Sequence, residues 1–157
     1  MVQLLKSDLE EFNSIIEEYL NHPNVKRLND YCAHGDVSVL KHSINVAKMA
    51  YYINKKYRLN ADEKTLLIGA LLHDFYLYDW HDKKLSFNIF KMHGFTHPKK
   101  ACENAIRIFD IDKDIQKVIS SHMWPLTLRS FPSSKEAKIV CVADKLCALL
   151  ETFHYDR

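Results

Sequence analysis

Nine histidines stand out in this chain of 157 residues, and several of them fall on helical stripes that are otherwise apolar. Asp144 lies within the segment IVCVADKLCALL, and Asp74 follows His73 in LLIGALLHDF. A carboxylate on an apolar helix face is costly to bury unless it is paired or bound to a cation. Imidazole and carboxylate suit Zn, Mn, Fe, Co and Ni, and no thiolate cluster competes with them. We therefore expect a metal ion to be the shared partner of these side chains.

Each of these residues also has an ordinary structural explanation. A single buried histidine more often hydrogen-bonds to the backbone, and a single buried aspartate more often caps a helix or pairs with a cation. The joint pattern favours the metal, because every structural explanation would otherwise have to hold independently.

The elements that must position these side chains are predicted to be helices. Only 3 Gly and 4 Pro occur, few for a β fold that needs frequent tight turns. We predict an all-α fold, a compact helical bundle of about six to seven helices that forms a single domain over residues 1–157. Apolar spacing and capping patterns predict helices over about 7–20, 38–57, 61–74, 98–109, 112–122 and 133–153.

The boundaries of these helices rest on local signals. Ser7, Asn60 and Ser133 are each followed three residues later by Glu, which predicts three capping boxes. Pro98 is predicted in the first turn of its helix. The aromatic segment 75–96 shows no clear period and is predicted as a long ordered loop over a site, and residues 32–36 as a polar loop.

Charge and composition argue against several classes of protein. Lys and Arg number 22 against 20 Asp and Glu, and the net charge of +2 is not typical of a nucleic-acid binder. No apolar run approaches the roughly 18–20 residues that cross a bilayer, and the N-terminus is acidic too early for a secretory signal. The four cysteines contain no C-x-x-C pair and indicate reduced thiols. We expect a cytoplasmic protein without a nucleic-acid polymer or a membrane as partner, and leave a homodimer open.

The arrangement of these residues resembles the HD-domain superfamily of metal-dependent phosphohydrolases. That family has a His on one helix, a His-Asp pair ending another, and a later helical Asp. Here these are His42 in LKHSINVAKMA, His73-Asp74 in GALLHDF and Asp144 in IVCVADKLCAL. The resemblance covers about residues 34–150, and the segment HDFYLYDWH is similar to small stand-alone bacterial HD proteins described as predicted hydrolases.

The resemblance further implies a binuclear centre. His97 in FTHPKKACENA and His122 in VISSHMW resemble the two added histidines of the binuclear branch. His93 competes with His97, which we favour because the following proline matches the family pattern. One or two divalent transition-metal ions (Fe, Mn, Co, Ni or Zn) are then implied, with Asp74 bridging and with the ligands His42, His73, Asp74, His97, His122 and Asp144. No G-Y-P follows His122, which argues against a cyclic-dinucleotide phosphodiesterase of the HD-GYP kind.

The activity implied by the resemblance is hydrolysis of a small phosphate ester by a metal-activated water. A nucleotide is the first candidate for this ester. His73, Asp74 and Lys145 are the expected catalytic residues. Lys145 is also a candidate substrate contact, since contact with a phosphate and pairing with a ligand carboxylate are equally open. The other candidate substrate contacts are His34, His93, Lys99 and Arg129. Two alternatives remain: a di-iron oxygenase that cleaves a C–C or C–P bond with O₂, and a non-catalytic metal-binding module.

Overall fold

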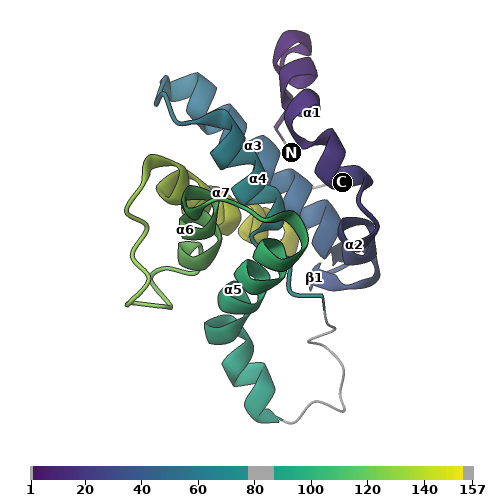
Figure 1. Cartoon of the computed structure of the whole chain (residues 1–157), viewed down its shortest axis with the longest axis vertical. Coiled ribbons are helices and arrows are strands. Elements are labelled where there is room, and N and C mark those ends of the chain that lie inside the picture. The colour runs from purple at the N-terminus through teal and green to yellow at the C-terminus, as the bar shows by residue number, and fades with distance from the viewer. Residues whose placement is uncertain (1, 78–86, 154–157) are drawn as a thin grey trace.

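The computed structural model describes residues 2–77 and 87–153, the first nine residues of the second range by their backbone only. Seven α-helices, one 3-10 helix and one short hairpin make up these ranges (Figure 1). In chain order they are α1 (Lys6–Asn21), α2 (Pro23–Lys26), η1 (Arg27–Asp30), β1 (Cys32–His34), β2 (Val37–Ser38), α3 (Val39–Tyr57), α4 (Glu63–Leu72), α5 (Phe87–Phe109), α6 (Lys113–Ser121) and α7 (Lys135–Thr152). The predicted all-α class is confirmed. Among these helices none is both long and apolar enough to cross a membrane.

Helix α4 lies at the centre of the bundle (Figure 1). Every residue from Leu66 to Leu72 is buried, and α4 contacts α1, α3, α5, α6 and α7. A helix that is apolar all round must be surrounded on all sides. Leu66, Leu67, Ala70 and Leu71 join an apolar cluster with α1, α3 and α7, whereas Ile68 and Leu72 join a second one with α5 and α6. The end of α4 is therefore fixed from several directions.

A close approach between α4 and α6 depends on Gly69. A Cβ atom built on Gly69 would lie 2.6 Å from Cγ1 and 2.8 Å from Cβ of Val118 on α6. Gly69 precedes His73 by four residues and Val118 precedes His122 by four, so this contact lies one helical turn before both histidines. The two imidazole rings have centroids 4.9 Å apart. The missing Gly69 side chain thus sets how closely the two helix ends meet.

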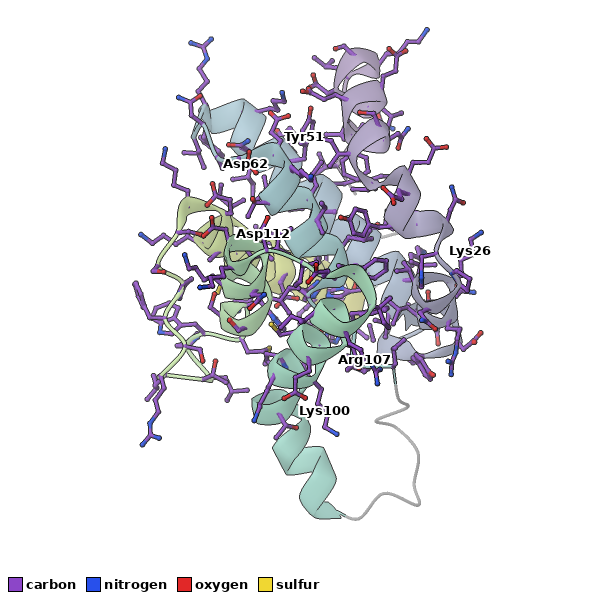
Figure 2. The ribbon with its side chains drawn as sticks, viewed as in Figure 1. Lys26, Tyr51, Asp62, Lys100, Arg107 and Asp112 are labelled. Atoms are coloured by element: carbon purple, nitrogen blue, oxygen red, sulfur yellow. The ribbon has the colours of Figure 1, made fainter. Side chains whose placement is uncertain are left out.

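Helix starts differ from the predicted capping boxes. The side chains of Ser38, Asp62, Asp112 and Ser134 accept hydrogen bonds from the backbone N–H groups at the starts of α3, α4, α6 and α7; Figure 2 labels Asp62 and Asp112. The predicted caps at Ser7, Asn60 and Ser133 are wrong. Helix α1 begins after Leu5 without a side-chain cap, and Asn60 has a positive φ of 53°, whereas an N-cap residue needs an extended backbone.

Two predicted loops are partly wrong. Residues 32–38 contain the antiparallel β1–β2 hairpin in place of a polar loop. Helix α5 begins at Phe87, so Pro98 lies inside it and not in its first turn. Proline lacks the backbone N–H donor of a helix interior. For this reason the sequence predicts a helix start at Pro98. Of the predicted aromatic loop 75–96, residues 75–77 lack regular secondary structure as predicted, residues 87–96 belong to α5, and residues 78–86 lie outside the described residues.

We expect Gly69→Ala to lower the free energy of unfolding by about 1–3 kcal/mol, because overpacking costs about that much in a well-packed core. Chemical denaturation of the metal-free protein measures the loss. The matched control is the double variant Gly69→Ala/Val118→Ala, which removes the two nearest methyl groups and should recover part of the stability. If Gly69→Ala is as stable as the wild type, the close approach does not constrain the two helices.

Candidate metal centre

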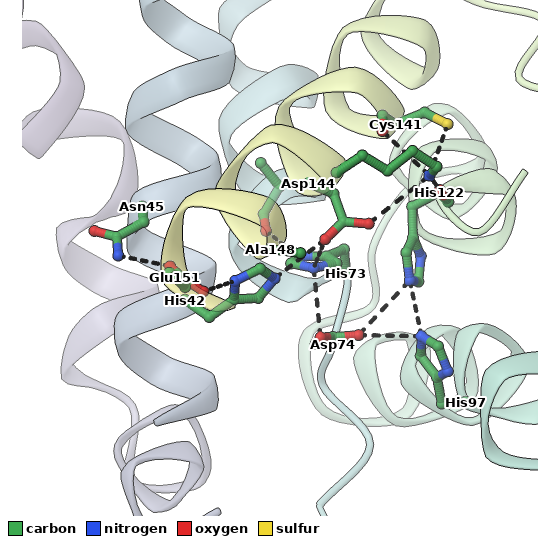
Figure 3. A network of polar contacts seen from close by, with 12 residues as sticks. His42, Asn45, His73, Asp74, His97, His122, Cys141, Asp144, Ala148 and Glu151 are labelled. Carbon is green, nitrogen blue, oxygen red and sulfur yellow. Dashed lines mark hydrogen bonds and ion pairs between the residues drawn. The ribbon is translucent and has the colours of Figure 1, made fainter. Parts of the chain in front are cut away.

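Six side chains from distant parts of the sequence meet in the middle of the bundle (Figure 3). His42 comes from the first half of α3, Asp144 from the middle of α7, and His97 from α5. His73 and His122 are the residues that end α4 and α6, and Asp74 follows His73. All six are buried, with at most 9% of any of them exposed. The structure thus brings together the six residues that the family resemblance implied as metal ligands.

His42 is held between two carboxylates of α7. Its Nε2 lies 3.1 Å from Oδ1 of Asp144, and its Nδ1 lies 2.7 Å from Oε2 of Glu151. The other carboxylate oxygen of Glu151 accepts a hydrogen bond from the Asn45 side chain at 2.9 Å. A carboxylate that accepts the Nδ1–H of a histidine fixes the ring so that Nε2 faces the metal. The row Asn45–Glu151–His42 therefore orients His42 toward Asp144.

His73 and His122 are both oriented by a hydrogen bond to a backbone carbonyl of the helix that they end. Nδ1 of His73 lies 2.7 Å from the carbonyl oxygen of Ala70, and Nδ1 of His122 lies 2.6 Å from that of Ile119. Each ring donates its Nδ1–H to the carbonyl three residues earlier, within the last turn of its own helix. Both Nε2 atoms are left facing the cluster with a lone pair, which is the form that binds a metal.

The Asp74 carboxylate is the common neighbour of three histidines. Its Oδ1 lies 3.2 Å from Nε2 of His97 and 3.6 Å from Nε2 of His122, and its Oδ2 lies 3.5 Å from Nε2 of His73. Nε2 of His97 and Nε2 of His122 are 2.9 Å apart. Two nitrogen ligands at right angles around one ion would be separated by about 3 Å. One oxygen of Asp74 thus faces the His97–His122 pair and the other faces His73, as a bridging carboxylate requires.

Two buried atoms of the cluster have no hydrogen-bond partner, although charged neighbours lie nearby. They are Nε2 of His73 and Oδ1 of Asp74. An unpaired buried polar group costs about 1–3 kcal/mol, and both atoms are of the type that binds transition metals. The candidate ligand atoms form three groups within 4.8 Å: His42–His73–Asp74, His73–His122–Asp144 and Asp74–His97–His122. The donor set therefore fits one or two divalent metal ions.

The protonation of the cluster follows from burial and charge together. For His42 the desolvation is outweighed by the hydrogen bonds to Asp144 and Glu151, which raise its pKa to about 10. For His122 burial, with His73 and His97 nearby, lowers the pKa to about 3. Burial opposes the charged form of Asp74, but His73, His97 and His122 hold its pKa below the ordinary value. The carboxylates are ionised and His122 is neutral, as metal ligands must be, whereas His42 is protonated in the metal-free cluster and would have to release a proton to bind a metal through Nε2.

A cavity of about 540 Å³ opens directly over this cluster. His34 of β1 and Lys145 of α7 both line it, as predicted for substrate contacts. The His34 ring lies edge-on to His42 with centroids 5.1 Å apart; burial and the neighbouring His42 lower its pKa. Nζ of Lys145 lies 3.9 Å from Oδ2 of Asp144 and donates to the carbonyl oxygens of His122 at 2.8 Å and Cys141 at 3.2 Å. Lys145 thus faces a ligand carboxylate and the cavity at once.

The other candidate substrate contacts lie elsewhere. Lys99 is largely exposed, with Nζ 3.9 Å from Oε1 of Glu103, and Arg129 is exposed as well. Neither lines the cavity over the cluster, so the geometry gives no support to a substrate contact for them. The His93 side chain lies outside the described residues.

Glu151 is the site residue that the sequence reasoning missed. It ends a buried stripe of α7 that includes Val140, Asp144 and Cys147. Its side chain is fully buried, and the spacing of seven residues from Asp144 places both on one helix face. A second acid on the same apolar face was the available signal.

The HD-domain family model matches residues 39–149, well over half of the chain. The chain therefore belongs to the HD-domain family, whose all-α fold and His/Asp metal site agree with the geometry above. No curated protein and no protein of solved structure shows a significant match.

We expect Glu151→Ala to weaken metal binding about 10–100-fold, because carboxylates that orient a metal-bound histidine contribute about that much. Glu151→Gln should lose less, since its amide oxygen can still accept the Nδ1–H of His42. Competition with a chelator measures the affinity, and Glu103→Ala, an exposed glutamate of α5, serves as control. Equal affinity in Glu151→Ala and Glu103→Ala would contradict the orienting role.

We expect His97→Ala and His122→Ala to lower metal content toward one ion per chain, because both remove nitrogen ligands on the same side of Asp74. Elemental analysis of purified protein measures the content. His93→Ala should leave it unchanged. A loss of metal in His93→Ala but not in His97→Ala would exchange the roles of the two histidines.

Proposed function

We propose that this HD-domain protein is a metal-dependent phosphohydrolase that cleaves a small phosphate ester, with a nucleotide as the first candidate. The supporting observation is the convergence of six His and Asp side chains, two of them with unpaired buried atoms, below an accessible cavity. A divalent metal bound by these side chains would supply an activated water near neutral pH and would neutralise charge on the phosphoryl oxygens.

In this proposal the side chains of the chain divide into two sets of ligands that share Asp74. His42, His73 and Asp144 would hold one ion on the α3–α7 side, and His97 with His122 would hold the other on the α5–α6 side. The groups His42–His73–Asp74 and Asp74–His97–His122 support this division, since both contain Asp74. Iron and manganese suit such a nitrogen and carboxylate donor set, as do cobalt, nickel and zinc.

Lys145 has a positioning role in the proposal. Its ammonium holds the end of α6 through the carbonyl of His122 and lies beside Asp144. It therefore fixes the position of His122 at the end of α6 relative to Asp144 of α7, and it places a positive charge at the cavity wall. His34 of the hairpin also lines the cavity and can contact the bound ester.

We expect Asp74→Ala and Asp144→Ala each to lose bound metal and to lower turnover at least about 100-fold, because the activated water is lost with the ions. Asp114→Ala, an exposed aspartate of α6, is the matched control and should keep both metal and activity. Asp144→Ala also leaves the buried His42 without one of its two carboxylate partners, so it should lower stability even relative to metal-free wild type. Full turnover and retained metal in both variants would contradict the proposal.

The reaction class is tested on the wild-type protein as purified. Its metal is identified by elemental analysis, and phosphate release from a panel of phosphate esters is measured beside O₂ consumption. Phosphate release without O₂ consumption is the expected result. O₂ consumption coupled to bond cleavage would instead identify an oxygenase, and neither reaction would favour a non-catalytic metal-binding module.

A further inference from the structure

The cavity over the metal centre has a polar floor and a mostly apolar wall. Its floor consists of the ligands Asp74, His97, His122 and Asp144. Above them the wall is formed by apolar side chains from the hairpin, the segment after α4, the segment after α6, and α7: Ala33, Tyr76, Met123, Pro125, Leu126 and Ala148. With a volume of about 540 Å³, the cavity is within the ordinary size range of small-molecule sites.

Positive charge is scarce among the described residues of this wall. Lys145 is the cation among the described lining residues. Its ammonium has three donors, and three acceptors already lie around it: the carbonyl oxygens of His122 and Cys141, and the Cys141 sulfur at 3.3 Å. No arginine occurs among the described lining residues. A di- or triphosphate would need several cationic contacts beyond the metal site, and the described lining residues do not provide them.

Hydrogen-bonding partners for the organic part of a ligand are equally scarce among the described residues of the wall. Apart from the metal-ligand floor and Lys145, the described polar groups on the wall are the ring of His34 and the hydroxyl of Tyr76. The hydroxyl groups of a sugar or polyol would lose hydrogen bonds to water on entering, and an unpaired polar group costs free energy. An apolar group would gain by displacing water from the same wall.

We infer that the ligand of this cavity is a phosphate monoester with a single phosphate and an apolar or aromatic organic group. The inference rests on the proposed function for the position of the phosphate at the metal centre, and on the wall residues for the organic group. A nucleoside monophosphate fits only if its base, and not its ribose, meets this wall.

A matched pair of non-hydrolysable ligands tests the inference without requiring turnover. Propylphosphonate and 2-hydroxyethylphosphonate have nearly the same shape and charge but end in a methyl and a hydroxyl group. Their affinities for the Mn²⁺-loaded wild-type protein are measured by calorimetry under nitrogen. We expect propylphosphonate to bind about tenfold more tightly or better, since an apolar pocket discriminates against an added hydroxyl by about 10–100-fold.

Two leucines of the segment after α6 provide a matched pair of variants. Leu126 lines the cavity and is 47% exposed, whereas Leu128 is 77% exposed and is not among the lining residues. Because both side chains are largely exposed, neither substitution should unfold the protein. Leu126→Asn should lower the ratio of the two affinities about threefold or more, and Leu128→Asn should leave it unchanged.

The outcomes separate this inference from the proposed hydrolysis. Equal affinities, tighter binding of 2-hydroxyethylphosphonate, or no measurable binding of either ligand would overturn the inference, even if the protein released phosphate from other esters. A clear preference for propylphosphonate that Leu126→Asn reduces and Leu128→Asn does not would support it. In that case, absence of phosphate release from both propyl phosphate and 2-hydroxyethyl phosphate would leave the ligand class standing and overturn the hydrolase.

Discussion

The burial of two carboxylates, Asp74 and Asp144, among four imidazoles is the constraint on which the rest of the structure depends. Removing these groups from water is expensive, and the surrounding helices offset only part of the cost through charge-assisted contacts. His42 and its partner Glu151 compensate Asp144, whereas Oδ1 of Asp74 keeps no hydrogen bond. The helices must therefore converge closely enough for a cation to complete the pairing, and α4, whose apolar sides are covered all round, is the element that makes this convergence rigid.

The chemistry of the site was more predictable than the helix boundaries. His42, His73 and Asp144 could be predicted because side chains of metal-ligand type are rarely found on an apolar helix stripe that packs in a core. Their spacing also matched a known family pattern. Such polar side chains on apolar stripes can be recognised in a single sequence. The position of His97 was predicted from the proline that follows it, although the same proline suggested a helix start that the structure does not have.

What could not be predicted depends on contacts between distant residues. Glu151 stands on the same face of α7 as Asp144, but only the approach of α3 shows that it meets His42 and Asn45. The helix start at Asp62 in place of Asn60 depends on the left-handed backbone of Asn60, which residue types alone do not reveal. Lys145 carries positive charge in any interpretation, yet its bonds to the end of α6 follow from the packing of α6 on α7.

The convergence of two helix carboxyl ends at the cluster has an electrostatic consequence. α4 ends at His73 and α6 at His122, and the last turn of a helix carries about half a unit of negative charge. Lys145 offsets this field at α6, whereas the last turn of α4 contains no basic residue. A phosphate approaching this floor meets two helix carboxyl ends and two carboxylates of its own sign, whereas these same groups attract a cation. The two helix ends therefore add to the carboxylates in favouring a cation over an anion at the floor of the cavity.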